Sequence, residues 1–347
     1  MCKTPRTHRT ELLENTHRPL LERINFAQFE KENYGIGSRL LSPLIKCCAA
    51  FNIDDDPWVE NLRQKEHTVE LEKVLRTGKT FCSEQLRKFL ERSCHIWEEL
   101  GGWATDFYIS ASIDQLQRSI QDASDMSHLD RMERIYLLEL LLAMPSPDAD
   151  QESNHVSSKL QNLLMFLEKS DKPDFSGLIF AKRRATVSVL VRILSLHPKT
   201  KDIFHCGAFV GWASNTNRKD SLGDLLHRDM QRDTLDEFRA GRKNLIVATD
   251  VLEEGIDVSA CSLVICFDKP ANLKSFVQRR GRARHQESTF AILISNEDDS
   301  MDLHKWQELE EVMIKAYQDD ERHRQEALEQ EATEENVSDR LWVEKTK

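Results

Sequence analysis

The chain has 347 residues, of which 31% are charged and 39% hydrophobic, and its formal net charge at pH 7 is -11. This length suits about two domains with buried cores, and the ordinary apolar fraction excludes a wholly disordered chain. No window approaches a membrane span, and the first residues lack the apolar core of a secretion signal. We therefore expect a cytoplasmic protein, with the nucleus as the alternative, and no membrane partner.

The acidity is concentrated near the C-terminus, because residues 301–347 hold 14 Asp and Glu against 7 Lys and Arg. Local fields rather than net charge decide nucleic-acid binding, so a basic face within residues 174–296 is not excluded. The eight cysteines are scattered, without a CxxC pair or a Cys/His array. We expect reduced, mostly buried thiols and no metal site.

Residues 1–40 are polar and interrupted by prolines, which predicts a linker or the remnant of a preceding first domain. From 41 to 150 the apolar spacing is helical, with breaks at Gly101-Gly102 and Pro145, and predicts an all-helical insert of four or five helices. Ser83 is the expected cap of one of these helices.

Residues 156–297 alternate between strand and helix patterns, which predicts a parallel sheet covered by helices. The predicted strands lie near 177–181, 203–209, 244–248, 262–267 and 289–295, and the predicted helices near 157–167, 183–195, 229–239 and 273–279. Residues 212–228 are a polar loop, for which we favour disorder over a place near bound RNA. Residues 300–347 predict one amphipathic helix, Trp306 to Tyr317, and an acidic tail.

Two short matches are rejected. Gly78-Lys79-Thr80 resembles the end of a P-loop, but the first glycine of that motif would fall on Lys73. Without it there is no nest of backbone N–H groups for a phosphate. Leu222-Gly223-Asp224 resembles a fragment of the ribonuclease III signature, but the surrounding acidic and apolar residues are missing.

Two runs carry most of the chemical information. The run from Asn244 to Val258 predicts a buried strand that opens onto a polar turn, which is where open α/β sheets bind ligands. The run from Gln278 to Arg284 puts four guanidinium groups within six residues, a pattern that can clamp phosphate oxygens. An arginine cluster alone is usually a solvated helix face; both runs in this order favour a polyphosphate site.

These runs resemble motifs V and VI of superfamily 2 helicases. Residues 177–190 are similar to motif IV, and residues 231–241 to the helix before motif V. The resemblance implies one RecA-like domain, the second of the two that such helicases contain. A helical insert directly before it is characteristic of helicases that resemble Dicer and the RIG-I-like sensors. Further details look like fungal-type Dicer-like endoribonucleases: residues 4–13, Glu253-Glu254-Gly255, the shortened ending at Arg284, and Trp306 with residues 316–322.

The resemblance assigns a nucleotide face to motifs V and VI. Arg282 and Arg284 are the implied donors to the γ-phosphate of ATP, with Gln278 supporting the same face. Asp257 is implied near the ribose or its water network, and Gly255 beside it. An arginine finger of this kind contributes about 10³ to 10⁵ in rate.

The resemblance also implies an RNA face. Thr249 and the Gly255 backbone are the expected contacts to RNA phosphates, and Lys182 and Arg183 are further candidates. The implied partners are double-stranded RNA and a first RecA-like domain, which would carry the P-loop and hold Mg²⁺. Neither P-loop, DExx nor ribonuclease III motif occurs in this sequence, so we expect no ATP hydrolysis and no RNA cleavage by this chain alone.

The implied biological setting is RNA silencing and antiviral defence by an ATP-dependent enzyme that processes double-stranded RNA. Two alternatives remain open from the residues: a stand-alone RNA-binding or regulatory module, and part of a RIG-I-like helicase. The sequence predicts no oligomeric state.

Overall fold

The computed structural model describes residues 19–28, 37–122, 126–144, 155–170, 174–211, 222–226, 229–253, 258, 260–298, 305–309, 311–312 and 315. The chain divides into two compact units. The first comprises Met1–Lys269 with Gln278–Glu297, and the second Pro270–Val277 with Asp298–Lys347. The sheet and the helical insert both belong to the first unit.

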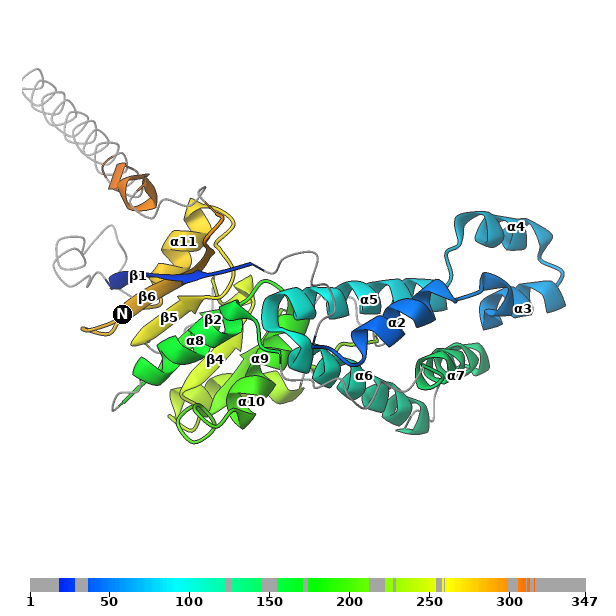
Figure 1. Cartoon of the computed structure of the whole chain (residues 1–347), viewed down its shortest axis with the longest axis horizontal. Coiled ribbons are helices and arrows are strands. Elements are labelled where there is room, and N and C mark those ends of the chain that lie inside the picture. Colours follow the sequence, from blue (N-terminus) through cyan, green and yellow to red (C-terminus); the bar gives the residue numbers. More distant parts are fainter. Residues whose placement is uncertain are drawn as a thin grey trace, which may run out of the picture. The chain divides into compact units, whose positions relative to one another are not determined.

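A single six-stranded sheet organises the first unit (Figure 1), and its strand order is β1-β6-β5-β2-β4-β3. Every neighbouring pair is parallel. The strands are β1 (Leu20–Phe26), β2 (Gly177–Phe180), β3 (Cys206–Phe209), β4 (Leu245–Ala248), β5 (Leu263–Cys266) and β6 (Thr289–Ser295). The predicted α/β fold with a RecA-like parallel sheet is confirmed.

Strand β1 was not predicted from the sequence. It lies within the segment expected to be a linker or remnant, yet it pairs with β6 from Leu20 opposite Thr289 to Phe26 opposite Ser295. Only Ile24 of this strand is buried. An edge strand with one buried side chain lacks the apolar run that identifies inner strands such as β2, β4 and β5.

Four α-helices lie in the described part of the predicted α/β region, and their positions confirm the sequence prediction. They are α8 (Ser158–Lys169), α9 (Arg184–Leu196), α10 (Asp229–Arg239) and α11 (Leu273–Arg280). Ser157 caps α8, because its side chain accepts a hydrogen bond from the amide of Leu160.

The helical insert contains six α-helices among its described residues, rather than four or five. They are α2 (Leu41–Ala49), α3 (Pro57–Gln64), α4 (Thr68–Thr77), α5 (Phe81–Leu100), α6 (Gly102–Asp122) and α7 (His128–Leu142), with a 3-10 turn, η2 (Ile53–Asp55), before α3. The break at Gly101-Gly102 separates α5 from α6, as predicted.

The rejected P-loop match is a turn between two helices. Gly78 ends α4 in the left-handed conformation, with φ of 65°. Thr80 is the N-cap of α5, and its side chain accepts from the amide of Ser83 while the Ser83 hydroxyl accepts from the amide of Thr80. The prediction that Ser83 is the N-cap is therefore wrong. Thr80 is the N-cap, and Ser83 is the third helical residue, the other member of the capping box.

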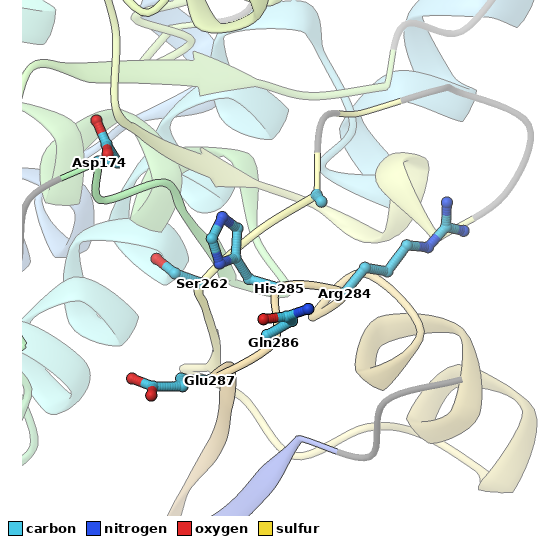
Figure 2. Close-up of a pocket in the computed structure, with 7 residues that line it drawn as sticks. Asp174, Ser262, Arg284, His285, Gln286 and Glu287 are labelled. Carbon is cyan, nitrogen blue, oxygen red and sulfur yellow. The ribbon is translucent and has the colours of Figure 1, made fainter. Parts of the chain in front are cut away.

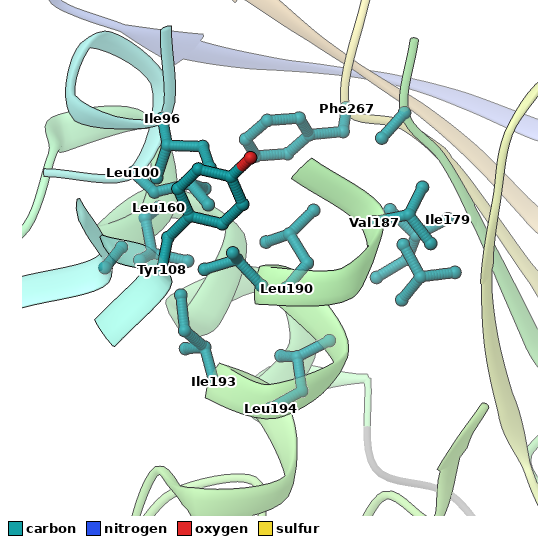
Figure 3. Close-up of a cluster of buried hydrophobic side chains, with 14 of the residues drawn as sticks. Ile96, Leu100, Tyr108, Leu160, Ile179, Val187, Leu190, Ile193, Leu194 and Phe267 are labelled. Carbon is teal, nitrogen blue, oxygen red and sulfur yellow. The ribbon is translucent and has the colours of Figure 1, made fainter. Parts of the chain in front are cut away.

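The insert and the sheet share one hydrophobic core. Figure 3 shows Ile96 and Leu100 of α5 and Tyr108 of α6 beside Leu190 of α9 and Phe267. All five side chains are at most 1% exposed. A sequence boundary between the insert and the α/β region is thus not a boundary in packing.

The second unit contains part of the predicted C-terminal helix. Residues 305–309, 311–312 and 315 are helical, and the rings of Trp306 and Phe276 meet edge to face with centroids 5.2 Å apart. The rest of that helix and the acidic tail lie outside the described residues.

Candidate nucleotide and RNA site

Three adjacent strands end in register at the carboxyl edge of the sheet. Phe180 at the end of β2 lies opposite Ala248 of β4 on one side and opposite Cys266 of β5 on the other. The chain then continues into Lys182, Thr249 and Asp268 respectively. Open α/β sheets bind ligands at this edge, where the strand order reverses around β2.

Thr249, predicted to contact RNA, is 5% exposed. Its amide donates to the carbonyl of Phe209 at 3.1 Å, and its hydroxyl oxygen accepts from the amide of Gly211 at 3.4 Å. Thr249 therefore fastens the end of β3 to the end of β4. Its contact with RNA stays a prediction.

The two motif IV residues lie at the same edge. Lys182 is exposed, and its amide donates to a carboxylate oxygen of Asp268 at 2.6 Å. The guanidinium of Arg183 lies 3.7 Å from the carboxylate of Glu91 on α5. Arg183 thus contacts the helical insert, and its predicted RNA contact is untested.

Motifs V and VI meet at Glu253. The buried guanidinium of Arg279 donates to the Glu253 carboxylate at 2.7 Å, and Arg282 donates to the Glu253 carbonyl at 2.9 Å. Arg279 also donates to the backbone carbonyl of Asp268 at 3.1 Å and lies 5.0 Å over the ring of Phe180. One carboxylate therefore joins the two runs, which the sequence placed in one site.

Arg279 was not among the predicted site residues. Its side chain is 7% exposed and that of Glu253 10%, so this is a buried ion pair in which each charge depends on the other. A cluster of four arginines does not reveal which side chain turns inward. The only sequence signal is the acidic pair Glu253-Glu254 in the preceding motif.

Arg284 makes a different contact from Arg282. Its side chain is exposed and donates to the carbonyl of Gly281 at 2.8 Å. It lines a cavity of about 470 Å³ together with Asp174, Ser262 and residues 285–287. Asp174 lies before β2, Ser262 before β5 and residues 285–287 before β6. Figure 2 shows the guanidinium of Arg284 extended away from the other labelled side chains.

The remaining predicted nucleotide contacts are only partly described. Gln278 lies on α11 and is partly buried. Gly255 and Asp257 lie outside the described residues, so the structure says nothing of their positions.

A buried ionic network lies beside Arg279. The ammonium of Lys159 on α8 is hydrogen-bonded to the carboxylate of Glu99 on α5 and, at 3.1 Å, to that of Asp268. The Lys159 side chain is 8% exposed and each carboxylate 20%. The ammonium also lies 4.1 Å from the ring centroid of Phe267. We call these three charged residues the Lys159 network.

The two carboxylates of the Lys159 network differ in acidity. Burial raises the pKa of Glu99 above its ordinary value, although Lys159 opposes this. Burial acts in the same direction on Asp268, but Lys159 and the amide of Lys182 outweigh it and lower the pKa of Asp268. The pKa of Asp268 is therefore shifted in the opposite direction from that of Glu99, although both carboxylates contact the same ammonium.

The rejected match Leu222-Gly223-Asp224 lies against the insert. The hydroxyl of Tyr108 donates to the carbonyl of Gly223 at 2.9 Å, and Arg92 donates to the carbonyl of Leu222 at 2.8 Å. Gly223 has φ of 82°, which favours glycine. The described end of the polar loop is thus bound by α5 and α6 through its backbone.

A second contact anchors the same segment to the α/β region. Arg184, the first residue of α9, donates to both carboxylate oxygens of Asp224, at 3.0 and 3.1 Å, and to the carbonyl of Gly211 at 2.7 Å. Side chains of the insert and of α9 thus hold this segment from two directions.

Neither a metal cluster nor a membrane helix is found where the structure is described. No three His, Cys, Asp or Glu side chains in these residues come together as metal ligands. Across the same residues, no helix combines the length and apolar character that crossing a bilayer requires.

Comparison with known proteins finds a family model that matches part of the chain and relatives that match all of it. Residues 157–286 match the model of the helicase conserved C-terminal domain. The whole chain is 55% identical to Dicer-like protein 2 of Aspergillus terreus and 51% identical to Dicer-like protein 2-1 of Aspergillus niger, of which it covers 26% and 25%. Over 95% of its length it is 37% identical to Dicer-like protein 2 of Cryphonectria parasitica and covers 23% of that protein.

The chain spans about a quarter of the length of these relatives. The family match coincides with the parallel sheet from β2 to the end of motif VI. The identity extends beyond it, over the helical insert. Residues 157–286 thus match the helicase C-terminal domain family, and the chain as a whole is similar to a region of Dicer-like protein 2.

Proposed function

We propose that this region supplies arginine side chains and RNA-backbone contacts for ATP-dependent action on double-stranded RNA, in RNA silencing and antiviral defence. The observation that carries the proposal is the joint at Glu253, whose carboxylate accepts from Arg279 and whose carbonyl accepts from Arg282. Through this joint, a change at the polar turn after β4 alters the arginines of motif VI directly.

The donor set fits a polyphosphate. Arg282 and Arg284 present planar guanidinium groups, and Gln278 an amide, all of which donate to phosphate oxygens. Among the proposed nucleotide contacts, Asp257 is the one carboxylate, and we assign it to the ribose. Mg²⁺ would be held by a first RecA-like domain, and bound ATP would supply the phosphoryl group. The contribution of this chain is to orient positive charge toward developing negative charge.

The RNA face is proposed at the carboxyl edge of the sheet. Its support is the register of β2 and β4, which brings exposed Lys182 and the turn beginning at Thr249 to one edge. Lys182, Arg183, Thr249 and the Gly255 backbone would contact RNA phosphates, which carry no sequence information. Binding should therefore be independent of sequence.

ATP turnover in the presence of double-stranded RNA tests the nucleotide half of the proposal. We expect no turnover by this chain alone and turnover when it is mixed with a matching first RecA-like domain. Arg282→Ala should lower kcat of the mixture by about 10³-fold or more. Arg118→Ala, on the exposed part of α6, is the matched control and should leave kcat unchanged. Turnover by this chain alone would refute the proposed division of the site.

RNA binding tests the other half. We expect weak binding of double-stranded RNA whose affinity falls steeply with salt, because each phosphate contact releases counter-ions. Lys182→Ala should reduce the slope of log affinity against log salt by about one unit. Equal slopes for Lys182→Ala and the unsubstituted chain would remove Lys182 from the RNA face.

A further inference from the structure

The Lys159 network connects three separate parts of the first unit. Glu99 lies in the last turn of α5 in the insert, Lys159 in the first turn of α8, and Asp268 two residues after β5. One ammonium group thus bridges a carboxylate of the insert to a carboxylate at the carboxyl edge of the sheet.

Asp268 extends this connection to motifs IV and VI. Its carboxylate accepts from the amide of Lys182, and its backbone carbonyl accepts from the guanidinium of Arg279. Arg279 in turn holds the Glu253 carboxylate. A continuous chain of hydrogen bonds therefore runs from α5 through Lys159 to the joint between motifs V and VI.

Because these hydrogen bonds are buried, their strength depends closely on the relative positions of the groups that form them. Hydrogen bonds between charged groups in a region of low dielectric are strong only at good geometry, and a buried charge without its partner is costly. A shift of α5 relative to β5 would separate Lys159 from one of its carboxylates. The network thus favours one arrangement of the insert over alternatives.

We propose that Lys159 is a positioning residue that couples the helical insert to motif VI, so that the position of α5 sets the position of the Arg279 and Arg282 side chains. The inference deepens the proposed function and rests on the role of motif VI given there. Any ligand that moves the insert would act on the nucleotide face through this ammonium. The Lys159 network converts a shift of α5 relative to β5 into a change at Asp268.

Hydrogen exchange measured by mass spectrometry on the full 347-residue chain tests the coupling without ATP. Lys159→Met should raise the exchange rates of amides 278–284 about tenfold, the ratio that corresponds to a local loss of about 1.4 kcal/mol. Methionine keeps the apolar stem beside Phe267, so a lysine that only packs there would tolerate this change. Lys159→Arg, which keeps the charge, should return the rates toward those of the unsubstituted chain.

The matched control is Lys199→Met. Lys199 also forms an ion pair with a carboxylate of α8, Glu168 at 2.7 Å, but both side chains are about half exposed. This variant should leave the exchange of 278–284 unchanged. Equal exchange in the Lys159 and Lys199 variants would overturn the proposal.

A charge-free variant separates positioning from stability. Combining Lys159→Met with Glu99→Gln and Asp268→Asn leaves no unpaired buried charge, so the unfolding midpoint should recover toward that of the unsubstituted chain. Exchange at 278–284 should stay raised, because the link is still broken. If exchange recovers together with stability, Lys159 is only structural and the proposal is wrong.

The mixture with a first RecA-like domain supplies the functional readout. Lys159→Met should lower kcat for ATP by roughly 10- to 100-fold, the size expected when catalytic groups are displaced by about 1 Å, with little change in KM. If the unsubstituted mixture shows no turnover, the proposed function fails while the exchange experiment still decides the coupling. An unchanged kcat beside raised exchange would refute control of motif VI by Lys159.

Discussion

The two halves of the helical insert are built differently. The inner half, α5 and α6, contributes Ile96, Leu100 and Tyr108 to the core that also contains the sheet. The outer half, α3 and α4, has its own small cluster of Val59, Leu62 and Val74. Apolar burial is the main stabilising term in folding, so the inner half should unfold with the sheet and the outer half separately.

A buried polar contact between described residues joins the outer half to α5. The hydroxyl of Thr80, the N-cap of α5, donates to the carboxylate of Asp56 at 2.6 Å. The same carboxylate caps α3, because it accepts from the amide of Trp58. The inner half, in contrast, has the Lys159 network, the backbone contacts to residues 222–224 and the shared core. A movement of the outer half therefore reaches the sheet through α5 and also through α7, against which α3 packs.

Truncating one leucine in each core should give the largest effects and test this comparison. Leu190→Ala removes a side chain that is 0% exposed in the shared core, and Leu62→Ala one that is 1% exposed in the outer cluster. Each should cost about 2–5 kcal/mol locally. Only Leu190→Ala should lower the urea midpoint of the sheet; Leu62→Ala should raise hydrogen exchange in α3 and α4 alone. A common loss of midpoint would show that the two cores are one.

Two glycines with left-handed backbones provide a smaller and more specific contrast. A Cβ at Gly223 would lie 2.1 Å from the Tyr108 hydroxyl oxygen, whereas a Cβ at Gly78 would meet no atom within 4 Å. Gly78→Ala should cost about 1–2 kcal/mol, the conformational penalty alone. Gly223→Ala adds overpacking of about 1–3 kcal/mol and should release residues 222–224 from the inner half. Thermal unfolding of the two variants would measure this difference in stability. Equal midpoints for Gly78→Ala and Gly223→Ala would contradict it.

The sequence predicted the inner part of the fold better than its edges or its long-range contacts. Strands β2, β4 and β5 have four buried residues each, so their apolar runs were readable. β1 buries only Ile24 and was missed. Motif VI identified an arginine cluster, but its inward-facing member, Arg279, could be known only once β2 and motif V were packed around it. The Lys159–Asp268 contact joins residues 109 apart, which no local pattern reveals.

The pH dependence of stability should distinguish the Lys159 network from an exposed ion pair, with the smallest expected effect. The pKa of Glu99 is raised in the folded chain, so its contribution to stability is complete below its unfolded pKa and declines as pH rises through the folded value. The pKa of Asp268 is lowered, so its contribution is present above its unfolded pKa and declines as pH falls through the folded value.

Glu99→Gln should therefore remove a decline in stability that begins above the ordinary glutamate pKa of 4.5. Asp268→Asn should instead lower stability at neutral pH, and the further loss of stability in acid should be smaller than in the unsubstituted chain. Glu168→Gln, which removes the exposed partner of Lys199, should change neither slope, because solvent screens that pair. Urea midpoints measured from pH 4 to pH 8 would decide among these outcomes. Parallel curves for Glu99→Gln and Glu168→Gln would mean that the Lys159 network is no more coupled to folding than an exposed ion pair.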